Sequence, residues 1–198
     1  MERATCSGSG TDSRSKFEIR VGQTRELPNP RSGRKAATSP TAVLNYNLRH
    51  ERGDMSRYTV TRMINAPLDR IFETISDINN YSKAVPHIVK AEILSDVKSG
   101  VGTRFRETRL MEGKEATTEL QVTEYAKNER IRMVGDSHGT VWDSVFEVKP
   151  VEGKTELTLT MDANAHTVAA KLMTKLIGGM IQKGLEKDMD CVKTHCEE

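Results

Sequence analysis

Hydrophobic and polar residues alternate along most of the chain after residue 87, and this alternation predicts a series of β-strands. Each alternating stretch is separated from the next by residues typical of turns, such as Gly, Asn, Asp and Pro. The predicted strands cover residues 88–95, 103–111, 115–125, 129–135, 139–149 and 154–163. Because the separators are short, we expect an antiparallel meander in which sequence neighbours pair.

Helical spacing is found at both ends of this alternating region. Residues 57–64 predict a first strand, and residues 67–78 then repeat apolar side chains at intervals of three and four, as in an amphipathic helix. We expect the Asn-Asn-Tyr that opens residues 79–84 to break this helix, and Pro86 to end a short second one. Residues 166–195 carry one broad apolar stripe, which predicts a helix roughly 45 Å long. A stripe of that length needs a curved sheet to cover it.

The first 54 residues differ from the rest in charge and pattern. Residues 1–54 hold ten Lys and Arg against six Asp and Glu, a net charge of +4, whereas residues 55–198 hold 20 against 22, a net charge of −2. Because residues 1–54 show no apolar periodicity, we expect them to be disordered. Codons for residues 51–53 can form a purine-rich tract resembling a bacterial ribosome-binding site. Our hypothesis is therefore that Met55 is the natural start.

Composition narrows the class of protein. No run of about 18 apolar residues is present, so we expect no stable membrane insertion, while transient contact with a membrane stays open. Three cysteines do not form a disulfide framework, and we expect a cytoplasmic protein. The net charge of +2 gives no indication of nucleic acid as a partner. The oligomeric state is not predicted.

Three segments carry a family resemblance. They are "INAPLDRIFETISDINNYSKAVPHI" at 64–88, "VTEYAKNERIRM" at 122–133 and "GKTELTLTM" at 153–161. Together they resemble motifs of the START-like (SRPBCC) superfamily, and the similarity covers residues 57–196. The resemblance implies an α+β helix-grip fold: a curved seven-strand antiparallel sheet wrapped around a long C-terminal helix, with two short helices after the first strand.

Within that superfamily the chain looks most similar to bacterial polyketide cyclase/dehydrase-like and coenzyme Q-binding-like proteins. Those families imply a cavity between the sheet and the C-terminal helix that binds an apolar small molecule such as a lipid, a quinone or a polyketide-like compound. They carry no universal catalytic residue that could be transferred to this chain. The resemblance therefore indicates a fold and a ligand class but no reaction.

Side-chain parity along the predicted strands gives the residues that would line this cavity, because alternate residues point to opposite faces of a sheet. The alternative for each of them is an ordinary packed core. The predicted ligand-binding set is Phe105, Glu107, Arg109, Leu120, Val122, Met133, Trp142, Phe146, Leu159, Met161, Leu172, Met173, Leu176 and Met180. Leu157 also falls on the inward face of its strand. The last four residues of the set lie on the long helix, which we expect to face the sheet.

Two charged residues break the apolar pattern. Glu107 and Arg109 share a strand face with Phe105, so both would enter the cavity as a pair and could anchor a polar group of the ligand. The other interpretation is a wet cavity mouth with both charges solvated. His87 is expected at the inward edge of the second strand, residues 88–95, sharing parity with Val89, Ala91 and Ile93. It is interpreted as a residue of the cavity entrance, and it joins Glu107 and Arg109 as a weak catalytic candidate.

Two functions fit this pattern: a carrier or chaperone for a hydrophobic molecule, and a cyclase or dehydratase that uses the same cavity. The sequence does not decide whether the protein is an enzyme. No metal site and no cofactor are expected, although Cys191, His195 and Cys196 lie within six residues of one another. Gly178 and Gly179 interrupt the long helix and are explained by close packing, for example against Trp142, or by a hinge.

Overall fold

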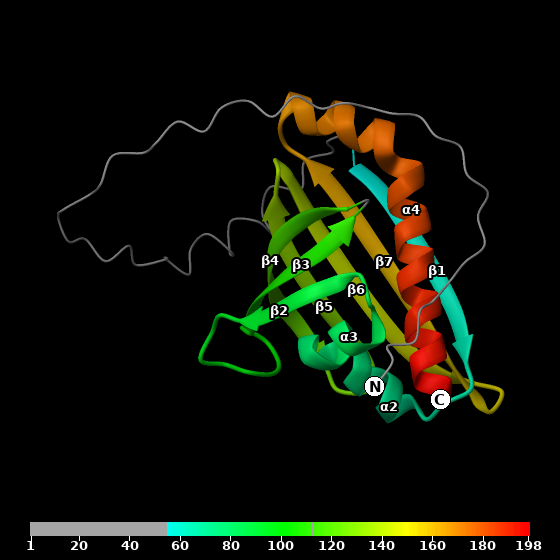
Figure 1. Cartoon of the computed structure of the whole chain (residues 1–198). Helices are drawn as coiled ribbons and strands as arrows, with labels where there is room; N and C mark the ends of the chain where they lie inside the picture. Colours follow the sequence, from blue (N-terminus) through cyan, green and yellow to red (C-terminus); the bar gives the residue numbers. More distant parts are fainter. Residues whose placement is uncertain (1–54, 112) are drawn as a thin grey trace. The chain divides into compact units, whose positions relative to one another are not determined.

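The computed structural model describes residues 55–111 and 113–198, and the predictions for residues 1–54 lie outside this range. The strands and helices follow one another as a first strand, two short helices, six strands and one long helix (Figure 1). Their bounds are β1 (Met55–Ile64), α2 (Leu68–Ser76), α3 (Ile78–Ala84), β2 (Ile88–Ile93), β3 (Arg104–Met111), β4 (Lys114–Ala126), β5 (Arg130–Ser137), β6 (Thr140–Val151), β7 (Lys154–Ala165) and α4 (Val168–Glu197). All predicted elements are therefore present, with ends shifted by a few residues.

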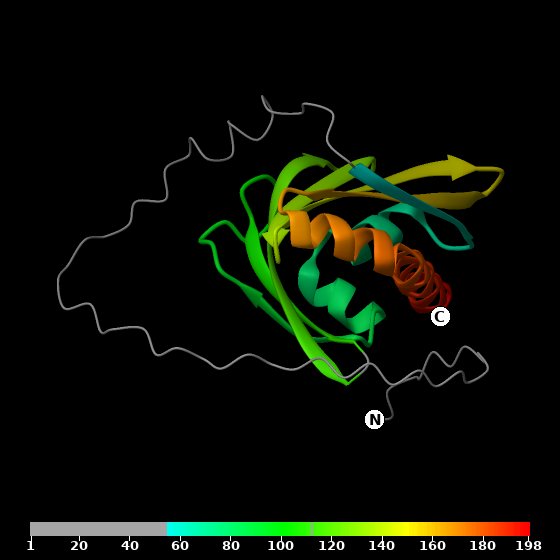
Figure 2. The same cartoon turned by 90° about the horizontal axis from the view of Figure 1, so that it is seen from above.

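The seven strands form one antiparallel sheet in the order β1-β7-β6-β5-β4-β3-β2. The meander β2 to β7 pairs sequence neighbours, and β1 closes the series by pairing with β7. Viewed from above, the sheet curves around α2, α3 and α4, which all lie on its concave side (Figure 2). The helix-grip fold predicted from the family resemblance is confirmed.

The break between the two short helices differs from the prediction. The Asn-Asn-Tyr at 79–81 lies inside α3, and the first helix instead ends at Ser76. Asp77 adopts an extended conformation, and its side chain accepts a hydrogen bond from the backbone N–H of Asn79 at 2.8 Å. An N-cap carboxylate of this kind starts a new helix, which explains why the break comes before the asparagines.

Strand parity holds along most of the sheet but fails at the start of β2. The pairing of β2 with β3 shifts register between Ile88 and Lys90. As a result Ile88 is buried and Val89 is 45% exposed. The expectation that Val89 points inward on the same face as His87 is therefore wrong. A β-bulge adds one residue to a strand and reverses the faces beyond it, a local irregularity that alternation alone does not reveal.

The core lies between the sheet and the C-terminal half of α4. Leu185, Met189, Val192 and Cys196 are buried there, against apolar side chains of the short helices and of the central strands. The convex face of the sheet instead carries ion pairs between strands. For example, Arg132 on β5 donates to Asp143 on β6, with its Nε 2.8 Å from Asp143 Oδ1. Apolar residues therefore lie on the inner face in this region and charged residues on the outer face, as expected when alternate residues point to opposite sides of a sheet.

Candidate functional site

The concave face of the sheet is apolar along its middle strands. Of the predicted lining residues, Phe105, Val122, Phe146 and Leu159 are buried, as is Leu157. Leu120, Met133, Trp142 and Met161 are partly buried. The partly buried Met133, Trp142 and Met161 lie at the end of the sheet from which α4 begins. The sequence therefore places these side chains on the correct face, while their role in binding stays a prediction.

The four predicted lining residues on α4 do not face the sheet. Leu172 and Leu176 are 71% and 75% exposed, and Met173 and Met180 are 47% and 48% exposed. The expectation that they cover the cavity is wrong. Small residues take the inner side of this half of the helix: Ala170 and Thr174 are buried there. The apolar stripe read from the sequence was broad enough to include both sides of the helix, so its spacing alone did not select the buried one.

A charged cluster interrupts the apolar inner wall. We call it the buried ion cluster, and it consists of Glu107 and Arg109 on β3 and Asp188 on α4. Arg109 Nε donates to Glu107 Oε1 at 2.7 Å, and Arg109 Nη1 donates to Asp188 Oδ2 across the space between sheet and helix. The side chains of Asp188, Glu107 and Arg109 are 6%, 13% and 26% exposed. The predicted pair of Glu107 and Arg109 is present, and most of the surface of its side chains is removed from solvent.

The electrostatics of the cluster follow from its burial. Burial opposes the positive charge of Arg109, but the carboxylates of Glu107 and Asp188 outweigh it and raise the pKa of the guanidinium further above its usual range. Tyr81 on α3 is buried beside the cluster, with its ring 5.9 Å from the ring of Phe146 between centroids. Burial and then the charge of Asp188 raise the pKa of the Tyr81 phenol. Its hydroxyl therefore stays protonated and can donate a hydrogen bond at neutral pH.

His87 lies in the same region, just before β2. Its Nδ1 atom is buried and has no hydrogen-bond partner among the described residues. Burial, followed by the positive charge of Lys187, lowers the pKa of the imidazole. The ring is thus neutral at pH 7, and a neutral imidazole can accept a hydrogen bond or a proton at one nitrogen. His87 therefore lies near Asp188 and Arg109 of the buried ion cluster, while its role at a cavity entrance stays a prediction.

Sequence reasoning missed two members of this region. Asp188 falls within the apolar stripe of α4, three residues after Leu185 and four before Val192. A carboxylate on the buried face of a helix needs a partner, so its position in the stripe was the available signal. For Tyr81, the sequence pattern predicts only a helix break. Nothing in local spacing shows that α3 brings its ring to β3 and α4, because that contact depends on how the short helices pack.

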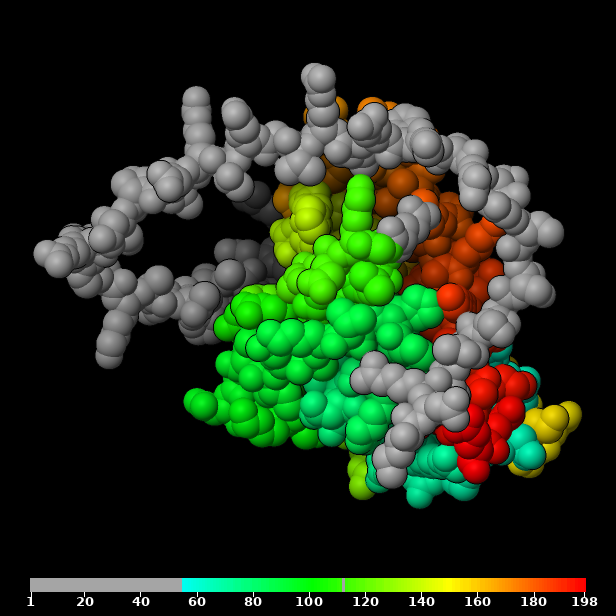
Figure 3. Space-filling view, viewed as in Figure 1, coloured from blue at the N-terminus to red at the C-terminus, as the bar shows by residue number. Residues whose placement is uncertain are grey.

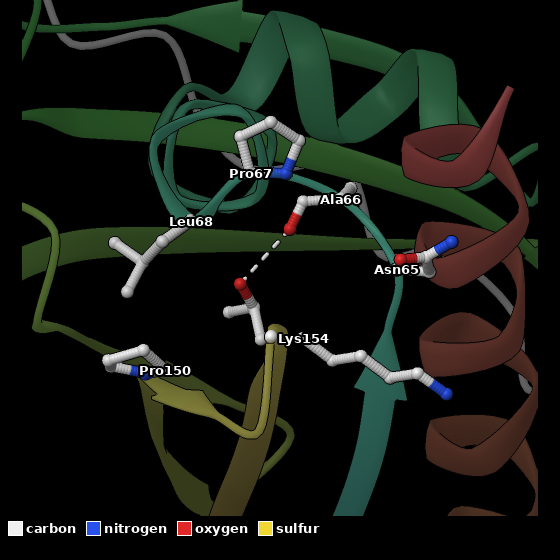
Figure 4. A pocket seen from close by; sticks show the side chains of 8 residues that line it. Asn65, Ala66, Pro67, Leu68, Pro150 and Lys154 are labelled. Carbon is white, nitrogen blue, oxygen red and sulfur yellow. Dashed lines mark hydrogen bonds between the residues drawn. The ribbon is translucent and has the colours of Figure 1, made fainter.

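A separate pocket opens at the C-terminal end of β1, where the chain enters α2 (Figure 4). It has a volume of about 480 Å³ and is lined by residues 65–68, 150 and 153–155. Thr155 Oγ1 donates to the carbonyl oxygen of Ala66 at 3.1 Å across it. Lys154 is the one ionisable residue of this lining, and none of the predicted site residues takes part. The buried ion cluster is for this reason the stronger candidate site.

The metal-like spacing at the end of α4 has a structural explanation. Cys191 and Cys196 are buried, and Cys196 Sγ lies 3.5 Å from the hydroxyl of Thr74, within hydrogen-bonding distance. In the described part of the chain, no three His, Cys, Asp or Glu side chains are grouped so that they could hold a metal ion. None of the helices in the same part is long and apolar enough to cross a membrane.

The comparisons with known proteins agree with this architecture. Residues 55–197 match the family model described as polyketide cyclase/dehydrase and lipid transport. A search among curated proteins finds no match. Among solved structures, the chain is similar to TTHA0849 from Thermus thermophilus, with 18% identity, coverage of 70% of this chain and 95% of that one, and a TM-score of 0.60.

Two further structures of similar fold come from other organisms. The Zhui aromatase/cyclase from Streptomyces sp. R1128 has 17% identity, coverage of 72% of this chain and 94% of that one, and a TM-score of 0.62. The major latex-like protein 151 from Panax ginseng has 9% identity, coverage of 74% of this chain and 100% of that one, and a TM-score of 0.59. At such low identity these similarities establish the fold and nothing finer.

Proposed function

This chain belongs to the polyketide cyclase/dehydrase and lipid transport family, and we propose that it binds a hydrophobic small molecule between the concave face of its sheet and α4, as a carrier or chaperone. The ligand class is a lipid, a quinone or a polyketide-like molecule. Affinity would come mainly from removing apolar ligand surface from water, at about 25 cal/mol per Å². The ligand must also carry a polar oxygen that can accept a hydrogen bond from the protein.

The buried ion cluster is the observation that carries this proposal. An arginine has five N–H donors, and two of those of Arg109 serve Glu107 and Asp188. The guanidinium is therefore held in a fixed orientation within an apolar wall, where it can donate to a carbonyl or hydroxyl oxygen of a ligand. The phenol of Tyr81 is a second donor in the same place. An apolar pocket with a few convergent polar groups is the usual form of a small-molecule site.

The only tryptophan of the chain offers a direct test, because Trp142 lies on the inner face of β6 and is partly buried. A quinone bound between sheet and α4 should quench its fluorescence, so titration with a short-chain benzoquinone measures binding. We expect saturable quenching in the wild type, weaker binding in Arg109→Met and partial retention in Arg109→Lys. Arg104→Met removes an outward arginine from the same strand and should leave binding unchanged. Equal affinities for the wild type and Arg109→Met would refute the anchor.

Native mass spectrometry of freshly purified protein tests the carrier function independently. We expect a co-purifying molecule that is released intact by organic extraction and carries both a long apolar part and a polar oxygen. Recovery of protein without any bound molecule, together with an absence of quenching, would contradict the carrier function.

A second candidate is a cyclase or dehydratase that uses the same space, and His87 is the observation that favours it. A neutral imidazole with a buried, unpartnered nitrogen could take a proton from a methylene group between two carbonyls, leaving an enolate near Arg109. The test is incubation with a poly-β-ketone thioester analogue followed by product analysis. Cyclised product that disappears in His87→Gln would support the enzyme, whereas unchanged substrate in the wild type would exclude this reaction for that analogue.

A further inference from the structure

The first half of α4 presents two different faces. Ala170, Thr174 and Gly178 are spaced by four residues and form the inner face, where a Cβ atom added to Gly178 would lie 3.1 Å from the hydroxyl of Tyr58 on β1. A second set is also spaced by four but is offset by two residues, which rotates it by about 200° to the opposite side. We call this second set the outer stripe, and it consists of Val168, Leu172, Leu176 and Met180.

The outer stripe is strongly exposed. Val168 is 86% exposed, and the fractions for Leu172 and Leu176 are 71% and 75%. These three side chains and Met180 form a continuous apolar row along about three turns of helix. Single exposed apolar residues need no explanation, but a contiguous row marks a surface that contacts something else. The orange part of α4 reaches the molecular surface in Figure 3.

The charges on this half of the helix are all of one sign. Residues 168–185 include Lys171, Lys175 and Lys183 and contain no Asp or Glu. A cationic helix with an apolar row fits an anionic, apolar partner. A second copy docking through the same face would bring like charges together. The segment 1–54 has ten basic and six acidic residues, so its net charge of +4 would also repel the lysines of this helix.

We infer that the first half of α4 docks on the surface of a lipid membrane that contains anionic lipids. In this arrangement the outer stripe enters the boundary between head groups and acyl chains, and the lysines contact the lipid phosphates. Residues 168–185 contain no aromatic residue and no arginine. Those are the residue types that dominate protein–protein hot spots, so a membrane fits this surface better than an acidic protein does.

Docking in this way would bring one end of the sheet close to the lipid. Met133, Trp142 and Met161, the partly buried residues of the inner face, lie at the end of the sheet where α4 begins. A hydrophobic molecule could therefore pass between the membrane and the inner face of the sheet with little exposure to water. This consequence depends on the proposed function, but the docking surface itself does not.

Co-sedimentation of the full chain with vesicles tests the inference. Vesicles of phosphatidylcholine alone are compared with an equimolar mixture of phosphatidylcholine and phosphatidylglycerol. We expect binding to the mixed vesicles that weakens as salt is raised. The double variant Leu172→Glu/Leu176→Glu should reduce partitioning by about tenfold or more, because it removes two apolar side chains and adds two negative charges.

The matched control changes two exposed aliphatic residues far from this helix. Val97 and Val101 lie in the loop between β2 and β3 and are 46% and 59% exposed. Val97→Glu/Val101→Glu alters the net charge by the same amount and should bind like the wild type. Circular dichroism of both variants establishes that they are folded.

Three outcomes would overturn the inference. The first is a wild type that binds neither kind of vesicle, and the second is equal binding by the wild type and Leu172→Glu/Leu176→Glu. The third is a wild type that is dimeric in size-exclusion chromatography and becomes monomeric in the same variant, since the stripe would then be an interface between copies. None of these measurements depends on an added cavity ligand, so they can fail independently of the quinone titration.

Discussion

Replacing Arg109 with methionine is the most informative perturbation of the buried ion cluster. The change keeps an unbranched apolar side chain in place of the arginine stem and removes the guanidinium. Glu107 and Asp188 then lose their common partner. Their side chains are only 13% and 6% exposed, so water can replace that partner only in part. Two carboxylates that cannot regain full hydration face each other across the space between β3 and α4.

The expected cost follows from the burial of these groups. Removing one partner of a buried pair typically costs about 3–5 kcal/mol, because it leaves an uncompensated charge in a poorly solvated place. Arg109 is still 26% exposed, so water can reach part of the cluster, and we expect a value near the lower limit, about 3 kcal/mol. In a folded domain of this size, each kcal/mol of lost stability lowers the melting temperature by about 2–4 °C. We therefore expect the melting temperature of Arg109→Met to be roughly 6–12 °C lower than that of the wild type.

Equilibrium unfolding in urea measures the effect, with circular dichroism and Trp142 fluorescence as independent probes. Arg104→Met is the matched control on the same strand, because Arg104 points outward and pairs with Glu119 at 3.5 Å. Both members of that pair are more than 40% exposed, so its loss should cost less than about 1 kcal/mol. Adding Asp188→Asn to Arg109→Met should recover at least about 1 kcal/mol, because it removes one of the unpaired charges.

A loss below about 1 kcal/mol in Arg109→Met would refute the reasoning, because exposed ion pairs contribute no more than that. The cluster would then be solvated, as in the alternative interpretation of Glu107 and Arg109 from the sequence. A large loss that Asp188→Asn does not reduce would show that the packing of the arginine stem, rather than the charge on α4, determines the effect.

Three further predictions concern single residues. Burial and nearby positive charge lower the pKa of His87, so its NMR titration midpoint should fall below the ordinary value of 6.5. The unfolded chain then takes up the proton first, and stability should decrease as pH falls from 6.5 through the lowered pKa; an unchanged decrease in His87→Gln would contradict this. Gly179→Ala should stabilise the protein by about 0.5–1 kcal/mol, because no described atom beyond its chain neighbours and the local helix backbone lies within 4 Å of the new Cβ. Gly178→Ala should gain less, and equal gains in thermal unfolding would refute the difference. Gly135→Ala should cost about 1–3 kcal/mol in urea unfolding, because its Cβ would clash with a backbone carbonyl oxygen of β4; wild-type stability would show that the strands can separate there.

The strands and helices could be predicted from the sequence because their signals are local and repeated, whereas the helix-grip fold was implied by the family resemblance. Alternation over β3 to β7 gave both the strands and their inner faces, and turn residues gave their antiparallel order. The bulge between Ile88 and Lys90 could not be predicted in the same way. A bulge changes pairing by one residue without altering composition, so alternation at Val89 indicated the wrong face.

The site could be predicted only in part, for a different reason. Glu107 and Arg109 were evident because they are charges on the inward face of a strand, a local property. Asp188 and Tyr81 join them through contacts between distant segments, 79 residues apart in the case of the bond from Arg109 to Asp188. Local spacing does not encode such contacts. Gly178 illustrates the same limit, since its packing partner is Tyr58 and not the expected Trp142.

The two halves of α4 differ in a way that connects the site to the surface. In the second half, Leu185, Met189 and Val192 are buried in the core, and Asp188 joins the buried ion cluster. In the first half, the small residues Ala170 and Thr174 are buried, whereas the large apolar residues Val168, Leu172, Leu176 and Met180 are exposed. A helix whose only task was to close a core would turn its large apolar side chains inward along its whole length, because each exposed leucine forgoes about 1.5–3 kcal/mol of burial. The reversed arrangement over residues 168–180 is therefore a cost to folding, and docking against lipid is the condition under which that cost would be recovered.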